Sequence, residues 1–315
     1  MTTSLEVLVS VRESSERYRE RLVDTPDTHY TFCETAAEVA RSIGRADVIL
    51  GSIAFPVEDL GRASRLRWIQ VTAAGVDRFL RRVKLPNGVR LTRADVGFGA
   101  QIAEYVLGHL LARTQRVCDV AHLQRARTWR PLSVEFLKDR TMGVAGTGSI
   151  GRTVAARARG IGMRTLGLAT TARDLPEFER VFAPEDKLEF LSRLDVLVLC
   201  LPLTERTYGF LGTAALAALK STVIVVNVAR GAVVDESALL EALQTRRIRA
   251  AILDVFEQEP LPKDHPLWGM DNVTVTSHHA GLNVPDDIID FFLENLARFR
   301  AGKPLRGQVD AGKGY

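Results

Sequence analysis

The sequence predicts an α/β protein built from two doubly wound domains, and three observations lead to this fold class. The chain has 315 residues, which is enough for two domains that each bury a core. Short apolar runs alternate with polar or amphipathic helical segments along most of its length. Many of these runs are apolar on both faces, which is typical of strands in a parallel sheet that helices cover on both sides.

The first hundred residues show this alternation clearly. Strand-like runs lie at residues 5–10, 46–51 and 66–75, and polar helical stretches separate them. The segment 101–113, "QIAEYVLGHLLAR", then places its apolar residues on one face, which predicts an amphipathic helix.

From residue 140 onward, predicted strands and helices alternate more regularly. We expect strands at residues 142–146, 164–169, 195–201, 222–228, 250–254 and 272–277, with one further weak strand at 180–183. We expect helices between them at residues 151–161, 184–193, 213–220 and 235–246. Regular strand–helix alternation of this kind predicts a doubly wound parallel sheet.

After Gly281 the pattern changes to a single helix, "VPDDIIDFFLENLARFRAG", with Pro285 near its start and Gly302 at its end. We place hinges near residues 98–102 and 282–285, so that the last thirty-odd residues return to the first domain. The predicted domains are therefore 1–99 together with 283–315, and 100–282.

Composition excludes several classes of protein. The chain is 46% hydrophobic and 25% charged, as in soluble globular proteins, and no apolar run approaches the ~20 residues of a membrane span. The net charge is +4, but the arginines are scattered among acids, which argues against nucleic-acid binding. Three widely spaced cysteines predict neither a disulfide framework nor a metal site. Because "MTTSLEVLVS" lacks a basic start, we expect a cytoplasmic protein.

A glycine-rich turn predicts a nucleotide site. The stretch "GVAGTGSIG" contains Gly146, Gly148 and Gly151 in the spacing GxGxxG, between a predicted strand and a predicted helix. The first glycine permits the tight turn, the second lets the backbone approach a pyrophosphate, and the third allows close packing of strand and helix. We therefore expect a Rossmann-like domain that binds a dinucleotide here, with Ser149 and Ile150 also in contact.

The end of the next strand bears on which dinucleotide binds. An acidic residue about 20 positions after the first glycine would bind the adenosine ribose of NAD. Ala169 stands at that place, followed by Thr170, Thr171 and Arg173, and no acid appears before Asp174. Two hydroxyls and an arginine suit a 2′-phosphate, so NADP(H) is the expected cofactor. The alternative is that NAD(H) binds without the acidic contact.

Three polar residues follow the carboxyl ends of three late strands. They are Arg230, Glu259 and His278, and in a doubly wound sheet the ligand crevice lies at these strand ends. A guanidinium can hold a substrate carboxylate in a fixed fork. An imidazolium can donate a proton to a carbonyl oxygen, and a neighbouring carboxylate favours that charged form and orients the ring. Together they fit hydride chemistry on a 2-oxo or 2-hydroxy acid.

The chain resembles the D-isomer-specific 2-hydroxyacid dehydrogenases from about residue 45 to its end. This resemblance implies a flavodoxin-like substrate domain beside an NAD(P)-binding Rossmann domain, and it places the family's catalytic residues on Arg230, Glu259 and His278. The matching segments are "LRWIQVTAAGVD" (66–77), "QIAEYVLGHLLA" (101–112), "DRTMGVAGTGSIGRTVAARARGIGM" (139–163), "DVLVLCLPLTERTYGFLG" (195–212), "VNVARGAVVDESALLEAL" (226–243), "ILDVFEQEPLPKDHPLW" (252–268) and "NVTVTSHHAG" (272–281).

The same resemblance implies further contacts. The substrate-carboxylate loop falls on Ala74 and Gly75, which would act through backbone N–H groups together with Arg230. The partner of the nicotinamide amide falls on Asp254. Other residues that we expect to contact the cofactor are Pro202, Thr207, Val228 and Gly281.

Two adjacent histidines compete for the catalytic role. The family pattern Thr-Pro-His-x-x-Gly aligns its histidine with His278, although Ser277 replaces the usual proline. Successive residues of a strand face opposite sides, so His278 and His279 are not expected to point into the same crevice. We expect His279 to be a neighbour without chemistry.

These observations predict an NADP-preferring, D-specific 2-hydroxyacid dehydrogenase that reduces small 2-oxo acids such as glyoxylate or hydroxypyruvate. The resemblance also suggests a homodimer, with the helix at 101–113 and the loop around Trp129 as contact candidates. Two alternatives stay open. One is a dinucleotide-sensing binding protein that keeps the fold without turnover, and the other is a dehydrogenase acting on phosphite.

Overall fold

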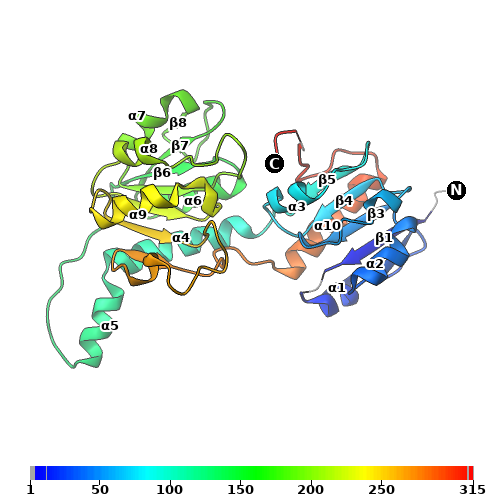
Figure 1. Cartoon of the computed structure of the whole chain (residues 1–315), viewed down its shortest axis with the longest axis horizontal. Helices are drawn as coiled ribbons and strands as arrows, with labels where there is room; N and C mark the ends of the chain where they lie inside the picture. Colours follow the sequence, from blue (N-terminus) through cyan, green and yellow to red (C-terminus); the bar gives the residue numbers. More distant parts are fainter. Residues whose placement is uncertain (1–3, 12, 311, 315) are drawn as a thin grey trace. The chain divides into compact units, whose positions relative to one another are not determined.

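The computed structural model describes residues 4–11, 13–310 and 312–314, and the chain divides into two compact units (Figure 1). Unit 1 combines Met1–Phe98 with Asn283–Tyr315, and unit 2 is Gly99–Leu282. Within each unit, helices and strands alternate along the chain and every strand pairing is parallel. The α/β fold class predicted from the sequence is therefore confirmed.

Unit 1 contains a five-stranded parallel sheet in the order β2-β1-β3-β4-β5. This is the flavodoxin-like order. The strands are β1 (Leu5–Ser10), β2 (Thr28–Phe32), β3 (Val48–Gly51), β4 (Trp68–Val71) and β5 (Arg90–Arg93). The helices are α1 (Ser15–Arg21), α2 (Ala36–Ser42), α3 (Asp77–Arg82) and α10 (Pro285–Arg300), with 3₁₀ turns η1 (Ile43–Arg45) and η2 (Leu60–Arg62).

Aromatic packing ties the C-terminal helix α10 into unit 1. The fully buried Trp68 of β4 stacks on Phe292 and Phe299, with ring centroids 5.3 and 5.4 Å apart. The buried Asn295 of the same helix donates a hydrogen bond to Gln70 Oε1 at 3.1 Å. Because stacked aromatic rings bury large apolar areas, these contacts explain why the last residues join the first domain.

Unit 2 contains a seven-stranded parallel sheet in the order β12-β11-β10-β9-β6-β7-β8. The chain first moves from β6 outward to β7 and β8 and then returns to the other side of β6, so the order reverses between β6 and β9. In such sheets, ligands bind beyond the carboxyl ends of the strands at this reversal. The strands are β6 (Thr141–Ala145), β7 (Arg164–Leu168), β8 (Arg180–Phe182), β9 (Val196–Leu199), β10 (Ile224–Asn227), β11 (Ala250–Leu253) and β12 (Val273–Val275).

The central strands of this sheet are buried on both faces, because helices and their connections cover them. The helices are α4 (Phe98–Thr114), α5 (Val117–Arg125), α6 (Ser149–Gly160), α7 (Lys187–Ser192), α8 (Thr213–Ala218) and α9 (Glu236–Gln244), with 3₁₀ turns η3 (Pro184–Asp186), η4 (Gly231–Val233) and η5 (Pro266–Gly269). Among the described residues, no helix is both long enough and apolar enough to span a membrane.

The sequence patterns missed three elements that the structure contains. Strand β2 reads "THYTF" and β5 reads "RLTR", so neither is an apolar run. Helix α5 has no buried residue, which leaves no apolar face facing a core. The predicted strand at 66–75 was too long, because it ends at Val71 and the chain then bends toward α3.

Candidate active site

The glycine turn lies between β6 and α6, at the reversal point of the sheet. Gly146 has a φ of 101°, a left-handed conformation that favours glycine. A Cβ at Gly146 would lie 2.5 Å from the backbone oxygen of Cys200, and one at Gly151 would lie 1.9 Å from the oxygen of Gly146. Both positions therefore need glycine for the backbone segments to approach this closely.

The remaining glycine, Gly148, faces open space. It is the N-cap of α6, and a Cβ built on it would meet no atom within 4 Å. The backbone N–H groups of Ser149, Ile150 and Gly151 belong to the first turn of α6, beside this space. A helix N-terminus of this kind suits an anionic group, so these residues fit a dinucleotide pyrophosphate.

The three residues expected beside a 2′-phosphate follow the carboxyl end of β7. Thr170, Thr171 and Arg173 are all exposed. Arg173 reaches back to the glycine turn, where its Nη2 lies 3.2 Å from both the backbone oxygen and the Oγ1 of Thr147. The structure thus brings a cation to the place where β7 and the glycine turn meet.

Glu259 and His278 form a hydrogen-bonded pair. His278 Nδ1 lies 2.9 Å from Glu259 Oε2, and Glu259 Oε1 accepts a hydrogen bond from the backbone N–H of Phe256 at 3.1 Å. Because a carboxylate can only accept, Nδ1 carries the hydrogen of this pair. The other ring nitrogen, Nε2, takes no part in this hydrogen bond. The His278 side chain is 41% exposed.

The two adjacent histidines contact different partners, although not for the reason that strand alternation predicts. Strand β12 ends at Val275, so both histidines lie in the loop beyond it. His278 has a φ of 55°, a left-handed conformation rare outside glycine. Its ring meets Glu259, whereas the His279 ring lies edge-on to Tyr105 with centroids 5.9 Å apart.

Asp254 holds the loop that carries both histidines. Its side chain is buried, and Oδ1 accepts from the backbone N–H of His279 while Oδ2 accepts from that of Ala280, both at 2.9 Å. Its backbone oxygen accepts from the N–H of His278, also at 2.9 Å. Oδ1 also accepts from Thr276. Oδ2 retains acceptor capacity, since a carboxylate oxygen has two lone pairs.

A buried asparagine holds the turn that carries Arg230. Asn227, at the end of β10, accepts from the backbone N–H of Ala229 at 3.0 Å and donates to the backbone oxygen of Arg230 at 3.1 Å. The half-buried Arg230 side chain also donates from Nη1 to the oxygen of Ala229 at 2.7 Å. The Arg230 side chain therefore extends from a turn whose backbone is held at both Ala229 and Arg230 by the Asn227 side chain.

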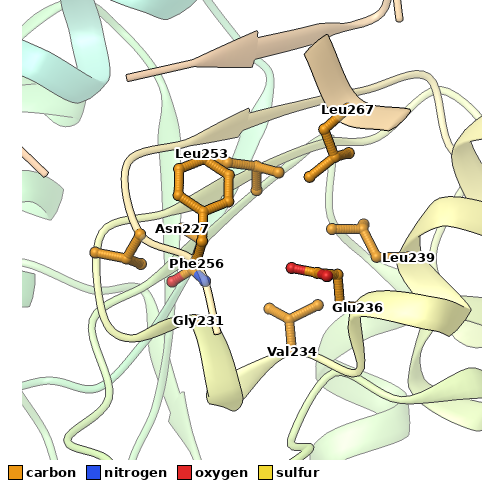
Figure 2. Close-up of a pocket in the computed structure, with 9 residues that line it drawn as sticks. Asn227, Gly231, Val234, Glu236, Leu239, Leu253, Phe256 and Leu267 are labelled. Atoms are coloured by element: carbon orange, nitrogen blue, oxygen red, sulfur yellow. The ribbon is translucent and has the colours of Figure 1, made fainter. Parts of the chain in front are cut away.

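The Arg230 turn and the Glu259 turn touch through their backbones. A Cβ at Gly231 would lie 1.9 Å from the carbonyl carbon of Phe256 and 2.1 Å from the nitrogen of Glu257. Beneath this contact is a small pocket, in which Figure 2 shows the Glu236 side chain pointing inward among Val234 and other apolar side chains. Glycine at position 231 lets the segments bearing the arginine and the glutamate lie against each other.

The other expected contact residues are divided between the units. In unit 2, the Thr207 hydroxyl donates to the backbone oxygen of Pro202 at 2.6 Å, and Val228 follows β10 directly. Gly281 follows the residues bound by Asp254. In unit 1, Ala74 and Gly75 lie in the bend between β4 and α3, where the oxygen of Ala74 accepts from Arg93 at 3.2 Å.

Comparison with known proteins identifies the family. The family model described as "D-isomer specific 2-hydroxyacid dehydrogenase, NAD binding domain" matches residues 107–280. The glyoxylate/hydroxypyruvate reductase A of Serratia proteamaculans is 33% identical over 266 residues, which cover 82% of this chain and 85% of that protein. This chain belongs to the D-isomer specific 2-hydroxyacid dehydrogenase family.

Solved structures of D-isomer specific 2-hydroxyacid dehydrogenases match nearly all of the chain. A family protein from Aeromonas salmonicida superposes with a TM-score of 0.89 at 32% identity, covering 98% of this chain and 100% of that one. The NADPH-dependent glyoxylate/hydroxypyruvate reductase of Sinorhizobium meliloti, solved with NADP and sulfate, gives 0.88 at 29% identity, covering 99% and 100%. Membership in this family makes the chain an NAD(P)-dependent oxidoreductase.

Sequence reasoning missed several residues that shape this dehydrogenase's site. Asn227 ends a buried strand immediately before the expected arginine, and that position could have singled it out. Tyr105 and Thr276 are 171 positions apart in sequence but are joined by a hydrogen bond of 2.8 Å. No local pattern carries this information, because only the folded chain brings α4 to the end of β12.

Proposed function

We propose that this chain is an NADPH-preferring, D-specific reductase of small 2-oxo acids such as glyoxylate or hydroxypyruvate. The observation that carries the proposal is the Glu259–His278 pair, which lies beyond the carboxyl ends of the sheet that also carries the glycine turn. Ligands bind at that edge of a doubly wound sheet. The names of the Serratia and Sinorhizobium proteins support the substrate class.

In this proposal His278 is the proton donor for reduction. Because Nδ1 is engaged with Glu259, Nε2 is the atom that donates to the carbonyl oxygen of the 2-oxo acid. In the direction of oxidation, Nε2 removes the proton from the hydroxyl group. Glu259 keeps the ring oriented, because its carboxylate accepts the hydrogen bond from Nδ1.

Arg230 is the proposed ligand of the substrate carboxylate. Its guanidinium offers parallel N–H donors that match a carboxylate, and its positive charge also polarises the neighbouring carbonyl group. Asn227 limits the movement of the turn that carries it. We propose that the backbone N–H groups of Ala74 and Gly75 also bind the substrate carboxylate, which makes unit 1 the substrate-binding domain.

Unit 2 is the proposed dinucleotide-binding domain. When bound, the nicotinamide supplies a hydride to the carbonyl carbon or accepts one from the alcohol. The first-turn amides of α6 would hold the pyrophosphate. Thr170, Thr171 and Arg173 would hold the 2′-phosphate. The remaining proposed contacts with the cofactor are Pro202, Thr207, Val228, Asp254 and Gly281.

A panel of 2-oxo acids crossed with NADPH and NADH tests this function. We expect glyoxylate and hydroxypyruvate to be reduced, with kcat/KM higher for NADPH by roughly tenfold or more, since a hydrogen bond to a charged group contributes about 1.5–3 kcal/mol. Arg173→Ala should lower this preference about tenfold, whereas Arg246→Ala, at an exposed ion pair with Asp271, should not. Binding of NADPH without turnover of any acid would favour a dinucleotide sensor, and oxidation of phosphite would favour the other alternative.

We further propose that two copies of the chain form a dimer through α5 and the segment after it. Figure 1 shows α5 projecting from the sheet of unit 2. Val117 and Val120 of α5 are 51% and 50% exposed, and Trp129 and Phe136 are 98% and 72% exposed. Large exposed apolar side chains grouped on one segment are typical of an interaction surface. The cytoplasmic location expected from the sequence stays a prediction.

Sedimentation equilibrium tests the dimer. We expect the unaltered chain to sediment as a dimer, and we expect Trp129→Ser combined with Phe136→Ser to raise the dimer Kd roughly a hundredfold or more, because buried aromatic anchors dominate interface energies. Tyr208→Ser, which removes another exposed aromatic ring outside this segment, is the control. A monomer at all concentrations of the unaltered chain would contradict the proposal.

A further inference from the structure

A chain of side-chain hydrogen bonds runs from α4 to the loop that carries His278. The Tyr105 hydroxyl lies 2.8 Å from Thr276 Oγ1, and Thr276 Oγ1 donates to Asp254 Oδ1 at 2.6 Å. All three residues belong to unit 2. Asp254 is buried, and Tyr105 and Thr276 are half-buried.

The carboxylate at one end fixes the direction of this chain. A carboxylate has no proton to donate, so the single Thr276 hydrogen points to Asp254, and the Tyr105 hydroxyl then donates to Thr276. Burial raises the pKa of Tyr105 to about 12. The phenol therefore keeps its proton at neutral pH and remains a donor.

At its Asp254 end, this series of hydrogen bonds continues to the backbone of the loop that carries His278 and His279. Three consecutive N–H groups, those of His278, His279 and Ala280, donate to the backbone and carboxylate oxygens of Asp254. His278 sits in the left-handed conformation that non-glycine residues rarely adopt, so its backbone needs such contacts to hold it.

The Thr276 bond sets how the Asp254 carboxylate is turned. Oδ1 accepts from both Thr276 and His279, which leaves Oδ2 aligned with Ala280. A second acceptor for the Thr276 hydroxyl, the backbone oxygen of Leu253, lies 3.5 Å away. The bond to Asp254 is the shorter of the two, and its acceptor is a carboxylate, which accepts more strongly than a neutral carbonyl oxygen.

We propose that Tyr105 and Thr276 are positioning residues that hold Asp254, and through it the backbone of His278, in the geometry for proton transfer. The proposal rests on the proposed function for the role of His278, but the hydrogen-bonded chain itself is independent of turnover. Neither residue is placed in contact with the substrate or the cofactor. Their removal should therefore lower kcat without weakening substrate binding.

Thr276→Val tests this inference by removing the hydroxyl while keeping the size and branching of the side chain. We expect amide hydrogen exchange at residues 278–280 to become about tenfold faster, with exchange in β6, β9 and β10 unchanged. We expect kcat to fall about tenfold and the KM value for the 2-oxo acid to change little. The solvent deuterium effect on kcat should increase, because proton transfer becomes slower relative to other steps.

Conservative variants separate positioning from a general loss of structure. Thr276→Ser restores the hydroxyl and should recover both the exchange pattern and kcat, whereas Tyr105→Phe should give smaller changes in the same direction. Thr245→Val is the matched control, since the Thr245 hydroxyl donates to the backbone oxygen of Glu241 in α9, away from the histidine loop.

Unchanged exchange at residues 278–280 in Thr276→Val would overturn the inference. A rise spread evenly over unit 2, or a loss of kcat that serine does not restore, would do the same. If the unaltered chain reduces no 2-oxo acid while the local exchange responds as expected, the proposed function fails but the positioning of the loop by Tyr105 and Thr276 is supported.

Discussion

Replacing His278 with asparagine should lower kcat for 2-oxo acid reduction roughly 10²–10⁴-fold, the usual range for the loss of a general acid. Asparagine retains a polar side chain beside Glu259 but has no proton that it can transfer to a carbonyl oxygen. The glycine turn that is proposed to bind the cofactor follows a different strand, β6, so the Kd for NADPH should change little. Steady-state kinetics and fluorescence titration of NADPH measure the two quantities separately.

The neighbouring histidine supplies the control for this experiment. His279→Asn keeps the backbone N–H that donates a hydrogen bond to Asp254. It removes an imidazole ring that packs against Tyr105 rather than bonding to Glu259. Its effect on kcat should be far smaller than that of His278→Asn. Equal losses in the two variants, or full activity of His278→Asn, would remove His278 from the proposed mechanism.

The second large effect is expected at Gly231. A methyl group at this position would lie 1.9 Å from the carbonyl carbon of Phe256, so the two backbone segments must separate in Gly231→Ala. Overpacking of this kind costs typically about 1–3 kcal/mol of folding free energy. Because the separating segments carry Arg230 and Glu259, kcat should fall by about 10² or more, as expected for a misplacement of about 1 Å.

Urea unfolding and kinetics together check this prediction. Gly269→Ala is a suitable control, because a Cβ at Gly269 would meet no atom within 4 Å and its φ is not positive. We expect this control to keep both its stability and its kcat. If Gly231→Ala behaved in the same way, the close contact between the Arg230 and Glu259 segments would have no bearing on catalysis.

Local patterns in the sequence were sufficient to predict the fold class. Strand β9 is apolar at every position because helices cover both faces of the sheet, so its burial could be predicted from consecutive residues. Gly146 and Gly151 were predictable for a similar reason, since each packs against backbone that an added methyl group would displace. The family resemblance then named Arg230, Glu259 and His278.

Other elements could not be predicted from such patterns. Strand β5, "RLTR", is held by its pairing with β4 rather than by an apolar sequence, and α5 has no buried residue, so it does not pack its apolar side chains into the core of unit 2. Strand alternation gave the wrong reason for distinguishing His278 from His279, because both lie beyond β12 and their ring contacts depend on the loop conformation.

By itself, the sequence determined the α/β class and the glycine turn, because burial and tight turns constrain neighbouring residues in the chain. The residues proposed for chemistry followed from its resemblance to a known family. Only the tertiary structure decided how those residues are held. The Asp254 bonds to the histidine loop, the Tyr105–Thr276 contact and the Gly231 approach to Phe256 each join segments distant in sequence. Such contacts depend on where the sheet places its strand ends, which no local pattern of residues specifies.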